Sequence, residues 1–447
     1  MELIYGIKDK PKFGKVILFA FQQLLAIMAA TIAVPAIVGN GLTASAALFG
    51  AGVGTIVYLL FTKSSSPVFL GSSFAFIGSM LSAFAGAASV QIGYWGLIIG
   101  ALMAGLVYVI IAIIVKICGV VWIDKLLPPI VIGPMIMIIG LGLAPSAVSQ
   151  IGISSGSVIE WKTLLVALIT FLTTAIVAVR GKGFLKIIPF LVGIVVGYIS
   201  SICFGLVDFT AVSEASIVGI PHFVIPFLHY TPSFSAILTI APIALVTMAE
   251  HIGDHTALSS IIDKDLLREP GLDKTLMGDG IATFVAGLIG GPANTTYGEN
   301  TSVVGMTKVA SVWVIGLAAI IAILLGFCSK FTALISTIPN AVLGGVSLLL
   351  YGFIAVNGLK VLVKNQIDFG KTKNVLVASA MLVLGLGGAA ISIVNGDLSI
   401  TITGMSLAAI VGILLNLFLP DEEEEVINKN SDKKPKAKKG KKEKVMA

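Results

Sequence analysis

The chain has 447 residues, of which 57% are hydrophobic and 12% charged, and its mean hydropathy is +1.03. A soluble globular domain carries about 25% charged residues, so this composition excludes an ordinary soluble protein and predicts an all-α polytopic membrane protein. The net charge of +6 does not indicate nucleic-acid binding, because the Lys and Arg residues lie at the ends of apolar segments and in the tail.

Apolar runs long enough to cross a membrane follow one another along almost the whole chain. The continuous runs lie at about 14–38, 46–62, 93–115, 126–148, 162–179, 184–207, 235–262, 311–329, 340–363, 374–394 and 402–419. Three further runs are apolar but interrupted, at 67–88, 275–290 and 291–308. The total of about 14 transmembrane segments is even, which puts both termini on one side of the membrane.

Basic residues follow every second predicted span, whereas the opposite loops hold few besides Lys162 and Lys330. Lys and Arg mark the cytoplasmic side of a membrane protein. We therefore predict a multi-pass protein of the cell membrane with both termini in the cytoplasm. The marking residues are Lys63, Lys116, Lys125, Arg180, Lys182, Lys186, Lys264, Arg268, Lys308, Lys360, Lys364, Lys371 and Lys373. Residues 420–447 are highly charged and are predicted to be a disordered cytoplasmic tail.

Two pairs of similar segments indicate an internal repeat. Residues 64–74 and 290–299 share small residues, a proline, an extended stretch and a glycine before a helix, and residues 127–133 resemble 338–344. Matched segments in the same order predict two halves of seven spans, and because seven is odd the second half is inverted. Spans 3 and 10 are then broken by short extended strands, and their helix N-termini point inward near the membrane midplane, as at transporter substrate sites.

Four acidic residues fall inside predicted spans, all in the second half: Glu250, Asp254, Asp279 and Glu299. A carboxylate buried in a membrane costs several kcal/mol unless it is protonated or paired. The four residues therefore mark a functional polar site. The alternative is a purely structural pairing with helix ends or polar side chains, and it is strongest for Asp279.

Glu250 and Asp254 are four residues apart and share one helix face, whereas His251 and His255 form a second row on that helix. A histidine on an apolar helix is more often a hydrogen-bonded structural residue than a proton carrier. The chain has no His-Glu-x-x-His pattern, and its three cysteines are far apart. We predict no metal site and no cofactor.

Glu299 follows Gly298 at the start of a predicted helix, and Phe74 holds the equivalent place in the first half. A planar ligand between the two helix starts would receive backbone N–H groups at its carbonyls and donate its ring N–H groups to Glu250 and Glu299. Alternating donors and acceptors of this kind form the edge of a pyrimidine-dione or an oxopurine. The spacing predicts a small polar ligand with N–H donors and does not choose the nucleobase.

Five segments resemble the nucleobase–cation symporter family, also called the nucleobase–ascorbate transporters, and within it the bacterial uracil permeases. They are Met248-Ala-Glu-His-Ile-Gly253, Lys264-Asp-Leu-Leu-Arg-Glu-Pro-Gly-Leu272, Asn294-Thr-Thr-Tyr-Gly-Glu-Asn300, Gly71-Ser-Ser-Phe-Ala-Phe76 and Gly344-Gly-Val-Ser-Leu-Leu-Leu-Tyr-Gly352. The resemblance covers nearly the whole chain except the tail. It implies a core domain formed by 13–119 and 235–331, a gate domain formed by 120–208 and 332–419, and often a homodimer.

The resemblance also implies roles for individual residues. Glu250 and Glu299 would bind the substrate through their carboxylates, and Phe74 and Gly298 would supply backbone donors. The family pattern implies two more residues of the substrate site. Ala30 would line the pocket, and Asn300 comes directly after Glu299, as it does in the family signature.

The chain departs from the family pattern at two acidic positions. Asp254 stands where uracil permeases have a histidine, with His255 next to it, and Asp279 replaces an asparagine. The proton-coupling candidates are therefore Asp254, Glu250, Asp279 and His255. Asp254 is also typical of xanthine and urate members, whereas Glu299 favours the uracil branch, because purine members commonly have glutamine there.

These observations predict a secondary transporter, not an enzyme, that imports uracil by proton symport through alternating access. Its expected partners are uracil, the proton, membrane lipid and a second copy of the chain. Two alternatives within the family are a xanthine or urate permease and a Na⁺-coupled nucleobase transporter that uses Asp254 and Asp279. The carboxylates argue against an inorganic anion as substrate, and the spans lack the residues of an intramembrane enzyme.

Overall fold

The computed structural model describes residues 3–85, 90–154, 156, 159–221, 223, 240, 243–395 and 398–420, and these are mostly helical. The elements of the first half are α1 (Phe13–Val38), α2 (Ala44–Phe61), β1 (Leu70–Ser72), α3 (Ile77–Ala85), α4 (Val90–Cys118), α5 (Val121–Leu126), α6 (Pro129–Gly142), α7 (Ala144–Gln150), α8 (Trp161–Arg180), the single turn η1 (Gly183–Lys186), α9 (Pro189–Cys203) and α10 (Thr210–Glu214).

The second half repeats the same kinds of element. They are α12 (Ile243–Ile262), the single turn η3 (Leu267–Gly271), α13 (Leu272–Leu288), β2 (Asn294–Thr296), α14 (Gly298–Thr307), α15 (Val312–Gly326), α16 (Ser329–Ser336), α17 (Asn340–Lys364), α18 (Thr372–Leu386), β3 (Ala390–Asn395), β4 (Leu398–Thr403) and α19 (Gly404–Phe418). The tail from residue 421 and most of the predicted span start at 235–242 lie outside the described residues.

Six helices of the described chain are long and apolar enough to cross a membrane, and the pair α15 and α16, bent by 80°, would make seven. The six are Phe13–Val38, Ala44–Phe61, Gly93–Cys118, Pro129–Gln150, Trp161–Arg180 and Asn340–Lys364. Each lies within a few residues of a predicted span, so this part of the prediction is confirmed. The helices α9, α18 and α19 are apolar but shorter. Of the four predicted intramembrane carboxylates, α12 and α13 carry three and α14 carries the fourth.

One predicted span is wrong at its C-terminal end. We expected residues 374–394 to be helical, but α18 ends at Leu386, and residues 390–395 form β3, paired antiparallel with β4. Alternation of β-branched and polar residues on both sides of the dipeptide Gly396-Asp397 is a sequence signature of a β-hairpin. The apolar content of the segment obscured this signal.

The two predicted extended segments are present, and they pair with each other. Strand β1 lies antiparallel to β2, with Leu70 opposite Thr296 and Ser72 opposite Asn294. The Ser73 N–H extends the ladder by donating to the Ala293 carbonyl at 2.9 Å. The two segments that share a sequence pattern therefore meet, and α3 and α14 begin beside this short sheet.

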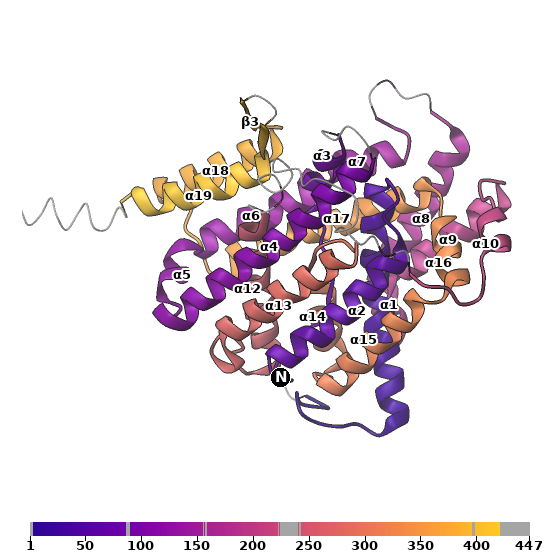
Figure 1. Ribbon diagram of the computed structural model, residues 1–447, viewed down its shortest axis with the longest axis horizontal. Helices are drawn as coiled ribbons and strands as arrows, with labels where there is room; N and C mark the ends of the chain where they lie inside the picture. The colour runs from indigo at the N-terminus through magenta and orange to yellow at the C-terminus, as the bar shows by residue number, and fades with distance from the viewer. Residues whose placement is uncertain are drawn as a thin grey trace, which may run out of the picture.

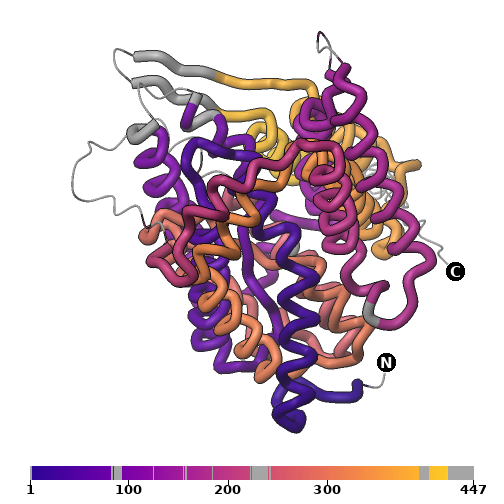
Figure 2. Tube along the Cα trace, turned by 90° about the vertical axis from the view of Figure 1, so that its right-hand side faces the viewer, coloured from indigo at the N-terminus to yellow at the C-terminus, as the bar shows by residue number. Residues whose placement is uncertain are grey.

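The contacts between helices fall mainly into two groups. Figure 1 shows one pair of neighbours, α18 and α19, side by side at the upper left. In one group α13 packs on α4 and α2, and α15 packs on α2 and α1. In the other, α17 packs on α6, α7 and α8, and α18 packs on α19 and α6. Contacts of α12 with α6 and α19, and of α1 with α9, join the groups. Figure 2 shows α1, in indigo, running along the body.

The N-terminal segment is attached to the end of α14. The N–H groups of Ile4 and Tyr5 donate to the Lys308 carbonyl at 2.8 and 3.3 Å, and the Tyr5 carbonyl accepts from the Ala310 N–H at 2.9 Å. The carbonyl of Ile7 accepts from the Val312 N–H at 2.9 Å. These bonds fix the end of the short helix that begins at Gly298.

Candidate functional site

A cavity of about 570 Å³ lies between α12, the start of α14 and the helices α6 and α17. Glu250, Asp254, Gly298, Glu299 and Phe74 all line it. These residues lie far apart in the sequence, and the fold brings them to one place. Five of the predicted site residues therefore share one cavity.

The two predicted faces of α12 are separate in the structure. Glu250 and Asp254 are partly buried and line the cavity, whereas His251 and His255 are fully buried. The two imidazole rings are stacked, with centroids 4.0 Å apart and an angle of 22° between their planes. The carboxylates can therefore meet a ligand from the cavity, and the histidines cannot.

Asp254 is held by the strand that precedes α14. The Thr296 hydroxyl donates to Asp254 Oδ2 at 2.7 Å. The other carboxylate oxygen, Oδ1, lies 3.4 Å from the position that a Cβ would occupy on Gly298. One oxygen of Asp254 is thus bound within the protein, and the other faces the space over the start of α14.

The N-terminus of α14 faces the cavity without a side-chain cap. Its N-cap residue, Tyr297, makes no capping hydrogen bond, and Gly298 and Glu299 are the first residues of the helix. The first N–H groups of a helix have no partners within the helix and carry partial positive charge. Backbone donors and the Glu299 carboxylate, an acceptor, are therefore available side by side to a ligand.

Tyr297, which follows β2, forms hydrogen bonds that join the second broken segment to the first and to α1. Its hydroxyl donates to the Ser72 carbonyl at 2.8 Å and accepts from the Thr31 hydroxyl at 3.4 Å. Its ring covers Gly71, where a Cβ would lie 2.5 Å from a ring carbon. A residue larger than glycine at position 71 would push the ring away, so Gly71 is required for this close approach.

Phe74 supplies an apolar part of the cavity wall. Its side chain is 7% exposed and lies edge-on to Tyr351 of α17, with ring centroids 5.8 Å apart. An aromatic wall beside carboxylates and backbone donors suits a flat polar ring. The site therefore combines one apolar surface with several directional polar groups.

Two predicted site residues lie away from the cavity wall. Asn300 is fully buried, where its Nδ2 donates to Gln23 Oε1 at 2.9 Å and its Oδ1 accepts from the Phe69 N–H at 3.2 Å. Ala30 is buried in the core on α1. The structure places Asn300 where it joins α14 to α1 and to the first broken segment.

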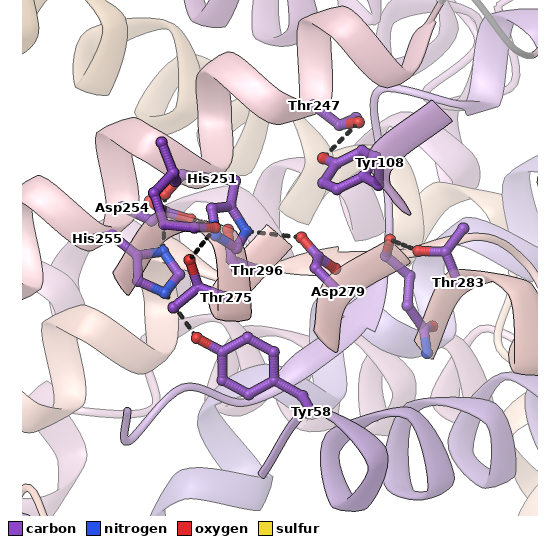
Figure 3. A network of polar contacts seen from close by, with 12 residues as sticks. Tyr58, Tyr108, Thr247, His251, Asp254, His255, Thr275, Asp279, Thr283 and Thr296 are labelled. Atoms are coloured by element: carbon purple, nitrogen blue, oxygen red, sulfur yellow. Dashed lines mark hydrogen bonds and ion pairs between the residues drawn. The ribbon is translucent and has the colours of Figure 1, made fainter. Parts of the chain in front are cut away.

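Asp279 also lies outside the cavity, within a buried polar cluster (Figure 3). Its Oδ2 is 2.7 Å from His251 Nδ1, and both side chains are fully buried. Within the described part of the chain, Asp279 Oδ1 and His251 Nε2 have no hydrogen-bond partner. Asp279 on α13 and His251 on α12 thus form a close buried pair.

The second histidine continues the cluster toward α2. His255 Nδ1 donates to the His251 carbonyl at 2.8 Å, and His255 Nε2 is 2.7 Å from the Tyr58 hydroxyl (Figure 3). The Tyr58 hydroxyl is also 2.9 Å from the Ser66 hydroxyl. A continuous set of buried hydrogen bonds therefore fixes the rear of α12, behind its carboxylate face.

Sequence reasoning missed the lining residues of α17 at the exposed end of the cavity: Asn357, Lys360 and Lys364. Lys360 Nζ donates to Asn357 Oδ1 at 3.3 Å, and Lys364 Nζ donates to the Ser260 hydroxyl of α12 at 2.6 Å. Their spacing of three and four residues places them on one helix face, and this signal was available in the sequence. Thr296 was also missed, because no local pattern pairs it with Asp254.

Among the residues that the structure describes, no three His, Cys, Asp or Glu side chains are grouped closely enough to hold a metal ion. Three carboxylates do line the cavity, and the nearby groups that contact them are a hydroxyl and backbone. The chemistry offered by the site is hydrogen bonding and proton exchange.

Comparisons with known proteins agree with a transporter. The model of a family described as "Permease family" matches residues 14–394. The uracil permease of Bacillus caldolyticus is 45% identical over 419 residues, covering 93% of this chain and 95% of the relative. The uracil permease of Bacillus subtilis (strain 168) is 44% identical, with 94% and 96% covered, and that of Escherichia coli (strain K12) is 40% identical, with 92% and 93% covered.

Solved structures share the fold at low sequence identity. The transmembrane domain of the cyanobacterial bicarbonate transporter BicA has a TM-score of 0.66 at 20% identity, covering 90% of this chain and all of that chain. The murine anion transporter Slc26a9, in an inward-facing state, has a TM-score of 0.65 at 13% identity, covering 94% and 69%. At these identities the likeness concerns the fold alone.

Proposed function

This chain belongs to the permease family and is a multi-pass membrane transporter, not an enzyme. We propose that it imports uracil by proton symport. The relatives of 40–45% identity that carry the name uracil permease support this substrate. The single observation that carries the proposal is the convergence of Glu250, Glu299 and the uncapped start of α14 on one cavity.

Uracil presents two carbonyls and two ring N–H groups along its edge. In the proposed complex Glu250 and Glu299 accept from the N–H groups, the backbone N–H groups at Gly298 donate to a carbonyl, and the Phe74 residue lies against the ring. Hydrogen bonds to charged groups are worth about 1.5–3 kcal/mol each, so two carboxylates select strongly for a ligand with N–H donors. Cavity volume is ample for such a ring.

The proposed architecture has fourteen spans in two inverted halves, with the core domain from 13–119 and 235–331 and the gate domain from 120–208 and 332–419. The antiparallel pairing of β1 with β2 supports the inverted relation of the halves. The preference of α13 for α4 and α2, and of α17 for α6 and α8, supports the division into domains. In transporters of this type the site lies between discontinuous helices, and one unit moves against the other.

In alternating access, the cavity is open first to one side of the cell membrane and then to the other. The exposed lining residues Lys360 and Lys364 belong to the basic end of the predicted spans. If both termini and these lysines are cytoplasmic, the cavity opens inward in this conformation. Movement of α17 with the gate domain, across the Lys364–Ser260 contact, would close this opening.

We assign the proton to a carboxylate of the cavity wall, Asp254 or Glu250, because these are the ionisable groups of α12 that line the cavity. Asp279 and His255, the other two coupling candidates, lie behind that wall in the buried cluster. Their proposed part is indirect, through the position of α12.

The test is uracil binding to the purified Glu299→Gln variant. Glutamine keeps the size of the side chain but replaces one carboxylate oxygen by a donor, so we expect the Kd to rise between about 10-fold and 150-fold, equivalent to about 1.5–3 kcal/mol. Glu214→Gln, an exposed carboxylate on α10, is the matched control and should bind as the wild type does. Unchanged binding in Glu299→Gln would remove Glu299 from the site.

A second candidate substrate is xanthine or urate, favoured by the acidic residue at Asp254. Competition of unlabelled uracil, xanthine and urate against a bound labelled nucleobase separates the candidates. Uracil should displace the labelled nucleobase at the lowest concentration. If xanthine or urate displaces it at a lower concentration than uracil does, the substrate is a purine and the protein is still a nucleobase transporter.

A further inference from the structure

We propose that Asp254 is a proton-dependent hydrogen-bond donor to a carbonyl of the bound nucleobase, and that Thr296 is the positioning residue that directs its proton into the cavity. The inference rests on the proposed function, because it assumes a nucleobase next to Gly298. It adds a specific atom for the proton and a role for a threonine of the strand β2.

The position of Thr296 is fixed by the backbone. Thr296 is opposite Leu70 in the short antiparallel sheet, and both residues are at most 1% exposed. From this fixed place its hydroxyl reaches Asp254 Oδ2 at 2.7 Å. The Thr296 hydroxyl is therefore a donor in a fixed position, and Asp254 Oδ2 is the carboxylate oxygen that accepts from it.

The other oxygen faces the proposed ligand. Asp254 Oδ1 lies 3.4 Å from the Cβ position at Gly298, and both residues line the cavity. Because Gly298 has no side chain, an atom the size of a Cβ fits between Oδ1 and the first turn of α14. A carbonyl bound at the backbone N–H groups of that turn would lie within reach of Oδ1.

The two protonation states of Asp254 then have opposite effects. When Asp254 is ionised, both oxygens are acceptors only, and Oδ1 repels a carbonyl oxygen. When it is protonated, Thr296 already donates to Oδ2, so the proton is on Oδ1 and is donated to the carbonyl. The proton enters from the aqueous cavity with the substrate and returns to water when the substrate leaves.

Other charged groups around Asp254 act on the same equilibrium. Glu250 on the same helix and Glu299 on α14 make a further negative charge in the cavity unfavourable, whereas Lys360 and Lys364 at its exposed end favour one. Further ionisable neighbours are Tyr297, which also lines the cavity, and Asp279, His251 and His255 behind α12. All of them are unchanged in the variants below.

The experiment measures the Kd of uracil between pH 5 and pH 9 for the purified wild type, Asp254→Asn, Thr296→Val and Thr296→Ser. Wild-type binding should weaken as the pH rises and Asp254 loses its proton. Asp254→Asn keeps an N–H donor at every pH, so its Kd should not change with the Asp254 titration. Proton-driven accumulation should be lost in this variant while uracil exchange survives.

Thr296→Val is nearly isosteric and removes only the hydroxyl. In the wild type, the hydrogen bond from the Thr296 hydroxyl stabilises the ionised form of Asp254. Without this bond, Asp254 should keep its proton to a higher pH, and the pH midpoint of uracil binding should rise by about one unit or more. Thr296→Ser should restore the wild-type midpoint. Thr174→Val, which removes a buried hydroxyl bonded to the Thr170 carbonyl of its own helix α8, controls for the loss of a buried hydroxyl as such.

The outcomes are distinguishable. A wild-type midpoint in Thr296→Val overturns the role of Thr296, and a wild-type pH profile in Asp254→Asn overturns the role of Asp254. Wild-type binding that does not depend on pH overturns the whole inference and leaves the uracil site intact. Absence of uracil binding to the wild type at every pH overturns the proposed function itself. Thermal unfolding of each variant verifies that it is folded.

Discussion

Substitution of Asn300 by alanine separates a positioning role from a ligand-binding role. The change removes the bond from Asn300 Nδ2 to Gln23 and the bond from the Phe69 N–H to Asn300 Oδ1. Hydrogen bonds between membrane helices average about 0.6 kcal/mol, but a buried group left without a partner costs about 1–3 kcal/mol. Gln23 and Phe69 are at most 1% exposed, so water does not replace the bonds, and we expect a loss of about 2–4 kcal/mol.

The assay is thermal unfolding of the detergent-purified protein, together with the uracil Kd. Asn300→Ala should unfold several degrees below the wild type, bind uracil more weakly because α14 is less well fixed, and regain part of its stability in excess uracil. Asn374→Ala, which removes an exposed bond to the Asp368 carbonyl, should leave both values nearly unchanged. A wild-type unfolding temperature with abolished binding would contradict a positioning role and make Asn300 a direct ligand of the substrate.

Two further predictions concern the elements around the site. Gly71→Ala places a Cβ 2.5 Å from the Tyr297 ring, so it should displace Tyr297 and reduce uracil binding. The control is Gly78→Ala, whose Cβ would meet no atom within 4 Å, and this variant should bind uracil normally. Equal uracil binding by the two variants would contradict the close packing of Gly71 against Tyr297. His251→Leu removes the hydrogen-bond partner of the buried Asp279 carboxyl group and should lower the free energy of unfolding by about 1–3 kcal/mol. Denaturant unfolding should show a smaller loss when Asp279→Leu is added, and an additive loss would count against the pair.

The sequence predicted the broken segments and the carboxylate face for physical reasons. Pro292, the polar run after it and Gly298 are incompatible with a lipid-facing helix, so the extended segment was evident. Charged residues are rare inside spans, so Glu250, Asp254 and Glu299 stood out against an apolar background. The separation of the carboxylates from His251 follows from helix geometry alone.

Other features depend on distant residues and could not be predicted. The register that places Thr296 opposite Leu70 belongs to two strands of three residues each, which are too short to specify pairing by themselves. The bonds of Asn300 to Gln23 and Phe69 likewise join segments far apart in the chain. The β3–β4 hairpin is different, because the dipeptide Gly396-Asp397 and the alternation on both sides of it were visible in the sequence, but the apolar content of the segment outweighed them.

Proton-driven uracil import can be measured as the uptake of radiolabelled uracil into proteoliposomes that hold the purified protein. The gradients compared are a proton gradient, a Na⁺ gradient and none. We predict accumulation above equilibrium with the proton gradient alone. Accumulation driven only by Na⁺ would contradict proton symport, and absence of uracil uptake under every gradient, from protein shown to be folded, would contradict uracil as the substrate.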